Sequence, residues 1–156
     1  MSILKVDTLQ PATGARVLSA GHIVQVVQGS TNTAMTSAST SYADTGLTAT
    51  ITPTSTSSKI LVRISQHYRF DRYGFSLKIM RGSTNVHAPT NNYMIYNSDS
   101  NADQRQHVNY EVIDSPSSTS ALTYKTQVIL ATSATVNLQL QGNDFYSFMT
   151  LMEIAQ

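Results

Sequence analysis

Residues 59–70, KILVRISQHYRF, carry the clearest structural signal in the chain. Apolar or aromatic residues occupy alternate positions at Ile60, Val62 and Ile64, and again at Tyr68 and Phe70. A period of two is typical of a β-strand with one buried and one wet face, because successive side chains point to opposite sides of a sheet. The stretch therefore predicts a half-buried antiparallel strand. On its wet face we expect Arg63, Ser65, His67 and Arg69.

The same alternation recurs on both sides of this strand. FSLKIMR at 75–81 follows a short turn at residues 71–74, and the two runs together predict a hairpin. Further alternating runs are LTATIT at 47–52, QHVNYEVID at 106–114, LTYKTQVIL at 122–130, TVNLQLQ at 135–141 and FMTLMEI at 148–154. With a first strand beginning near Ile23, about eight strands bounded by turns predict an all-β sandwich or barrel. No segment shows a helical period.

The composition favours strands and excludes several classes of function. Ser and Thr make up about a quarter of the chain, whereas charged residues make up only 12%. The net charge is +1 and the basic residues are scattered, so we expect no nucleic-acid partner. The chain has no Cys, which excludes disulfides and thiolate metal sites. No run is long and apolar enough to predict a signal peptide or a membrane-spanning helix.

Residues 1–20 differ from the rest of the chain. A short apolar run in ILKVDTL is interrupted by Pro11, Gly14 and Gly21 before a core-sized pattern forms. We therefore predict an extended N-terminal attachment arm at 1–20 and one β-sandwich domain at 21–156, since an arm that cannot bury itself docks elsewhere. The predicted contact residues of the arm are Ile3, Leu4, Val6, Leu9, Val17 and Leu18.

Two segments are candidates for surface recognition. HYRFDRYGF at 67–75 is the densest group of aromatic and cationic residues, and such side chains offer flat apolar area with a polar tip. Residues 82–103 are rich in turn formers and predict long loops at one end of the domain. Tyr68, Phe70 and Phe75 are interpreted as core residues. The candidate recognition residues are Arg69, Arg72, Tyr73, His87, Tyr93 and Arg105.

The sequence predicts neither an enzyme nor a cofactor or metal site. No nucleophile or phosphate-binding motif occurs. His22, His67, His87 and His107 stand singly, which favours surface positions, although three copies of one His could meet on a trimer axis. A carboxylate pair for glycoside cleavage would have to come from turn residues that ordinarily cap backbone groups. These carboxylates are Asp71, Asp99, Asp103, Glu111 and Asp114.

Several segments taken together carry a family likeness. They are ILKVDTLQPATG at 3–14, GHIVQVVQ at 21–28, the stretch from Thr40 to Val62, SLKIMRGSTNV at 76–86, DSPSSTSALTYKTQV at 114–128 and the terminal MEI at 152–154. This set resembles tail-fibre-like and other virion structural proteins of cyanobacterial and marine phages, over nearly the whole chain. The resemblance implies a trimeric jelly-roll domain on the exterior of a virion, with the N-terminal segment as the attachment arm.

The resemblance leaves two positions on the particle open. Because Met1 directly precedes the arm, no upstream shaft is expected. The arm could join a tail adaptor or baseplate, making a short tail fibre, or lie on the major capsid protein, making a cement or decoration protein. A receptor-binding role, in which outer loops recognise a host glycan or protein, is compatible with the fibre. A glycan-degrading enzyme is the third and least favoured class.

Overall fold

The computed structural model describes residues 19–98, 103–132 and 138–156, and it confirms the all-β prediction. These residues form eleven strands and no helix, so they contain no helical segment that could span a membrane. The strands are β1 (Ile23–Thr31), β2 (Met35–Ser37), β3 (Ala43–Ile51), β4 (Lys59–Phe70), β5 (Tyr73–Arg81), β6 (Thr84–His87), β7 (Ile95–Asn97), β8 (Gln104–Asp114), β9 (Leu122–Leu130), β10 (Leu138–Leu140) and β11 (Ser147–Ile154).

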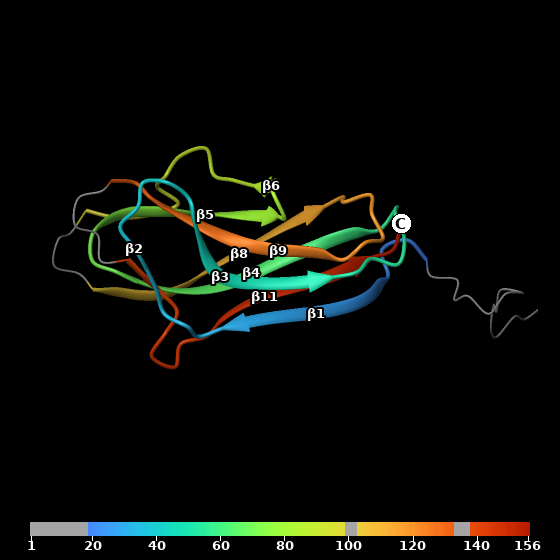
Figure 1. The fold of residues 1–156 in the computed structure, drawn as a ribbon, viewed down its shortest axis with the longest axis horizontal. Coiled ribbons are helices and arrows are strands. Elements are labelled where there is room, and N and C mark those ends of the chain that lie inside the picture. Colours follow the sequence, from blue (N-terminus) through green and yellow to red (C-terminus); the bar gives the residue numbers. More distant parts are fainter. Residues whose placement is uncertain (1–18, 99–102, 133–137) are drawn as a thin grey trace, which may run out of the picture.

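Two antiparallel sheets pack face to face (Figure 1). Sheet I has the order β1-β11-β4-β8, with the short strands β10 and β2 continuing beside the end of β4. Sheet II has the order β3-β9-β5, with β6 and β7 at the far edge of β5. The pairing is nested: β1 pairs with β11, β3 with β9, and β4 with β8. A ribbon of paired strands folded over itself in this way is a jelly roll, as expected.

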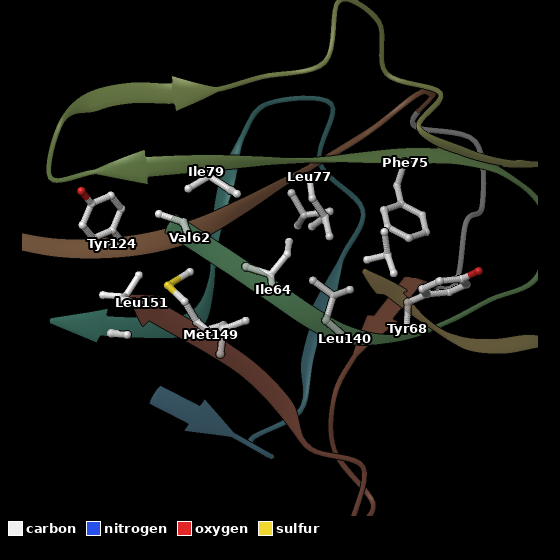
Figure 2. Packing of buried hydrophobic residues seen from close by; sticks show 14 of the residues in the cluster. Val62, Ile64, Tyr68, Phe75, Leu77, Ile79, Tyr124, Leu140, Met149 and Leu151 are labelled. Carbon is white, nitrogen blue, oxygen red and sulfur yellow. The ribbon is translucent and has the colours of Figure 1, made fainter. Parts of the chain in front are cut away.

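The core lies between the sheets and follows the alternation seen in the sequence. Side chains from β4 and β11 meet side chains from β5 and β9, as Figure 2 shows for Ile64, Met149, Leu77 and Tyr124. On β4, all five predicted core residues are buried, and Arg63 and Arg69 are exposed. His67 is on the predicted outer face, yet it is only 5% exposed.

The predicted hairpin of β4 and β5 is wrong. β4 belongs to sheet I and β5 to sheet II, so the chain crosses from one sheet to the other at Asp71 and Arg72. Tyr73 adopts a φ of 63°, in the left-handed region, where the strand direction changes. Two consecutive half-buried strands show the same alternation whether they pair or face each other across a core, and so the pattern could not decide between them.

The two Ser- and Thr-rich turns lie side by side. One joins β3 to β4 and the other joins β8 to β9, and the register places Ile51 opposite Leu122 and Ile60 opposite Asp114. Both turns therefore carry one paired ribbon from sheet to sheet. They lie at the end of the domain where β1 begins and the chain ends (Figure 1). We call this the proximal end, and the end with the β4–β5 turn the distal end.

The segment 82–103 is not a set of loops at one end. Its described part contains the short strands β6 and β7, both paired with β5. Its first turn lies toward the proximal end, because the Gly82 amide donates to the Thr123 carbonyl near the start of β9, at 2.9 Å. The segment differs from the prediction because the edge of β5 offers unpaired backbone groups, with which β6 and β7 form hydrogen bonds. A turn-rich composition does not exclude such short edge strands.

A buried carboxylate stabilises the proximal end of the domain by accepting hydrogen bonds from two other segments. Glu153 on β11 is 0% exposed and points between the sheets. Its Oε1 accepts hydrogen bonds of 2.7 Å from the Thr54 amide, the Thr54 hydroxyl and the Ser58 hydroxyl, and its Oε2 accepts one of 2.6 Å from Gln25 Nε2. Burial acts to raise the pKa of Glu153, but the hydrogen bonds from Gln25, Ser58 and Thr54 outweigh it and lower that pKa. The charged form therefore stabilises this end.

We predict that Glu153→Gln lowers the free energy of unfolding at pH 7 by about 1–3 kcal/mol, because an amide group cannot accept all four hydrogen bonds. The pKa of Glu153 is lower in the folded chain than its ordinary value of 4.5. The contribution is therefore complete above that value and is lost as the pH falls through the folded pKa. Urea unfolding at pH 7 and at several acidic pH values measures both effects.

Asp144→Asn is the matched control, since Asp144 is exposed in the turn before β11 and forms no ion pair among the described residues. Equal stability of the two variants at pH 7 would contradict the role given to Glu153.

Candidate interaction surface

The outer face of sheet I carries six of the eight large hydrophobic side chains that are exposed among the described residues. Ile23, Val26, Ile113 and Phe148 point outward from its strands. Phe145 and Tyr146 join them through ring contacts with His67 and Phe148. Single exposed hydrophobic side chains are ordinary, whereas several of them on one face of a domain favour an interaction surface there.

The strand register arranges these side chains in rows across the sheet. Val26 lies opposite Met152, Met152 opposite Leu61, and Leu61 opposite Ile113. The row therefore crosses all four long strands without a polar residue. Val26 and Ile113, at the two edges, are each 56% exposed, and the inner two are half-buried. We call these four residues the apolar row.

A polar row lies next to the apolar row on its distal side. It consists of Gln28, Thr150, Arg63 and Glu111, each opposite the next in register. Gln28 Nε2 donates to the Thr150 hydroxyl at 3.0 Å. Arg63 and Glu111 form no ion pair with the described residues. A hollow of about 470 Å³ lies over them, lined also by Asn109 and Tyr110. Polar groups of a binding partner can therefore enter this hollow and reach Arg63 and Glu111.

An aromatic and histidine cluster lies further toward the distal end. The ring of His67 stacks on Phe145, with centroids 4.4 Å apart, and meets His107 edge-on at 5.3 Å. Burial lowers the pKa of His67, and the nearby His107 and Arg105 lower it further. Phe145 covers the ring, which explains why a side chain on the predicted wet face is buried. The alternation of β4 gave no signal for this cover.

Several polar side chains on the outer face of sheet II form hydrogen bonds with one another. The Thr50 and Thr123 hydroxyls are 2.8 Å apart across β3 and β9. Asp44 accepts from Lys125 Nζ at 2.8 Å and from Gln127 Nε2 at 2.6 Å. These side chains are satisfied within the chain, whereas the outer face of sheet I exposes six large hydrophobic side chains.

Only some of the predicted recognition residues come together. Arg69 and Arg105, opposite each other on β4 and β8, share the carboxylate of Asp103 at 2.8 and 2.7 Å. Nearby at the distal end, the guanidinium of Arg72 lies 5.3 Å from the ring centre of Tyr73. These five residues are called the distal cluster. The hydrogen bonds from Arg105 and Arg69 lower the pKa of Asp103 to about 2.

Tyr93 and His87 have partners other than the Arg69–Asp103 ion pair. Tyr93 packs edge-on against Tyr96, with ring centres 5.5 Å apart. His87 is on β6 and its ring hydrogen-bonds the hydroxyl of Tyr110 on β8. Both side chains therefore pack on neighbours within the chain. The sequence segment that contains them gave no information about these pairings.

Two of the carboxylates considered for catalysis line one hollow, and two others lie elsewhere in the molecule. Asp114 forms an ion pair of 3.0 Å with Arg81 and accepts from the Tyr124 hydroxyl, whereas Glu111 lies on the outer face of sheet I. Asp71 and Asp103 line one hollow of about 460 Å³ at the distal end. Asp103 is held ionised by two arginines, which makes it unsuitable as a proton donor. Asp99 lies outside the described residues.

A buried polar network was missed by the sequence analysis. Thr126 on β9 hydrogen-bonds Thr45 on β3 at 2.6 Å and donates to Gln66 Oε1 on β4 at 2.9 Å. Gln141 accepts from Gln66 and Ser147 and donates to the Thr45 carbonyl. Its members are neutral amides and hydroxyls satisfied by one another, and so the network fixes the two sheets relative to each other.

The start of the domain is tied to its end. The Gly21 amide donates to the Ala155 carbonyl at 2.8 Å, and the Ala155 amide donates to the His22 carbonyl at 2.9 Å. Residues 1–18 lie outside the described part, and with them all predicted contact residues of the arm. The chain therefore enters the domain at the proximal end, opposite the distal cluster (Figure 1).

No protein-family model matches this chain, and a search of curated proteins finds no matching relative. The described residues also contain no group of three or more His, Asp or Glu side chains that could hold a metal ion.

We predict that Arg105→Gln raises the pKa of Asp103 from about 2 toward its ordinary value of 3.8, because Arg105 provides the largest stabilisation of the carboxylate. A carboxyl-carbon NMR titration of both proteins measures the shift. Arg63→Gln, which removes an arginine of β4 that does not contact Asp103, serves as the control. An unchanged Asp103 pKa in Arg105→Gln would contradict the ion pair.

Proposed function

We propose that this chain is a structural protein of a bacteriophage particle that acts by assembly and not by catalysis. It forms a short tail-fibre-like homotrimer on the particle exterior, attached through residues 1–20. The observation that carries the proposal is the exposed apolar face of sheet I, because a jelly roll that leaves six large hydrophobic side chains exposed on one face calls for a protein partner there.

The surface chemistry supports close packing of identical subunits. A net charge of +1 and a charged fraction of 12% leave little like-charge repulsion between copies. The hydroxyl-rich face of sheet II stays wet, while the face of sheet I is available for contact. These properties agree with the family likeness in the sequence, which independently suggests a trimeric virion component.

The two ends of the domain support a direction of attachment. The described part of the chain begins at the proximal end, and Arg69, Arg72, Tyr73 and Arg105 lie at the distal end. With the proximal end on the particle, the distal cluster faces outward. There it can contact a host glycan or protein, since arginine and tyrosine side chains suit such surfaces. A cement or decoration protein on the capsid would use the same arm.

We predict that deleting residues 1–20 leaves a folded domain that no longer joins the particle. Residues 23–154 contain all described strands, so we expect the domain to fold without the arm. Phage are grown with a tagged copy of either length. Immunoblots of purified particles then measure incorporation, and circular dichroism of the isolated chains measures folding.

A full-length variant with Ile3, Leu4, Val6 and Leu9 changed to Ser separates arm length from arm chemistry, and we expect it to fail as well. Incorporation of the deleted chain at the full-length level would contradict the proposal. Electron microscopy with a tag-directed label distinguishes the tail from the capsid.

A further inference from the structure

We propose that protonation of His67 opens the turn at residues 142–146 and uncovers Phe145, so that mild acid changes the outer face of sheet I next to the distal cluster. The inference goes beyond the proposed function and does not depend on it. Its basis is a buried histidine ring that lies beside basic side chains and is covered by a strained turn.

The side chain of His67 is enclosed although it is on the outer face of its sheet. The residue is 5% exposed, and its Nδ1 is buried without a hydrogen-bond partner among the described residues. The ring of Phe145 lies parallel to it, at an interplanar angle of 6° and a centroid distance of 4.4 Å. A protonated imidazole has two N–H donors. In the closed turn, protonation would therefore leave a buried positive charge and an Nδ1–H without an acceptor, which disfavours the charged form.

The neighbouring strand and β4 itself place basic groups around this ring. On β8, His107 lies directly opposite His67, with ring centroids 5.3 Å apart, and Arg105 is close enough to repel a charged ring. On β4, Arg69 is two positions away on the same face. Burial lowers the pKa of His67, and His107 and Arg105 lower it further. The face of Phe145 attracts a cation, but this attraction is outweighed.

The acidic groups nearby do not balance this charge. Asp103 accepts from both Arg69 and Arg105, at 2.8 and 2.7 Å. Asp144, in the covering turn, is exposed and forms no ion pair with any described residue. Tyr146, the other titratable residue of the turn, stacks on Phe148. A charged His67 therefore gains more from water than from the groups that enclose it.

Both ends of the covering turn are fixed within the domain. Gln141 and Ser147 are 0% exposed, and the Ser147 hydroxyl donates to Gln141 Oε1 at 3.1 Å. The backbone of His67 holds both of them. Its amide donates to Ser147 Oγ at 3.0 Å, and its carbonyl accepts from the Gln141 amide at 3.1 Å. Residues 142–146 can therefore move while β10 and β11 stay paired with β4.

The backbone between these fixed ends is strained. Gly142, Asn143 and Asp144 have φ angles of 96°, 51° and 68°, which places three successive residues in the left-handed region. This conformation costs Asn and Asp more than it costs glycine. The backbones of Gly142 and Phe145 hydrogen-bond each other at 3.2 and 3.0 Å. The turn is thus the part of the enclosure that yields when the ring becomes charged, because no core residue has to move.

Amide hydrogen exchange and a histidine-ring NMR titration from about pH 8 to about pH 5 test the opening, since histidine changes charge in this range. The pKa of His67 is lower in the closed turn than its ordinary value of 6.5. The closed turn therefore loses stability as the pH falls from 6.5 to the folded pKa. We predict that protection of the Gly142 and Phe145 amides falls over this interval, by up to about tenfold per pH unit for one proton. Protection of the Gln141 amide should persist.

His67→Gln keeps a neutral side chain under the turn and should abolish the fall in protection. His22→Gln, the same change at an exposed position of the proximal end, is the matched control and should retain it. Circular dichroism reports folding of both variants. Equal loss of protection at Gln141 and at the Ala155 amide would show that the whole domain unfolds and would contradict a local opening.

Phe145→Ala tests the cover independently of any change at His67. Without the Phe145 ring, water reaches the imidazole, so the His67 ring should titrate closer to 6.5 than in the natural chain. An unchanged midpoint in this variant would contradict the covering role of Phe145. A midpoint at or above 6.5 in the natural chain would overturn the proposal, because the attraction of Phe145 for a charged ring would then prevail.

Discussion

β4 pairs with other strands along both of its edges. This pairing determines which side chains meet in the core and which lie together on the outer face of sheet I. Residues 59–70 pair with β8 on one side and with β11 and then β10 on the other. Their inner side chains build the core, and their outer side chains set the rows of sheet I. Because neighbouring strands repeat the same period in register, Leu61 brings an apolar row to the surface, and Arg63 brings a polar one.

Alternation allowed the burial of strand residues to be predicted, but not their pairing. Ile60, Val62, Ile64, Tyr68 and Phe70 are buried as the pattern indicates, because the period of two is a local property. The β4–β5 hairpin was wrong, since the partner of a strand depends on distant segments. The same limit applies to Glu153, whose hydrogen-bond donors lie about 100 or more positions away, and to Phe145 over His67. The distal cluster was anticipated in part, because Arg69, Arg72 and Tyr73 are close in sequence.

The two outer faces of the sandwich explain why assembly is the favoured role. Hydroxyl and charged side chains of sheet II bond one another, as Lys125 does when it donates to Asp44. Sheet I leaves Val26, Ile113 and Phe148 exposed and Arg63 outside any ion pair of the described chain. Such a face is stable in isolation only at the cost of exposed apolar area. In the proposed function, a neighbouring copy removes that exposed area, and the contact between copies orients the distal end.

A reconstruction of the particle by electron cryomicroscopy tests the central claim most directly. The account predicts three jelly rolls around a common axis, with the outer faces of sheet I turned toward that axis and the proximal ends joined to the particle. A density in which this chain occurs as separate copies, with the apolar row of Val26 and Ile113 facing solvent, would contradict it.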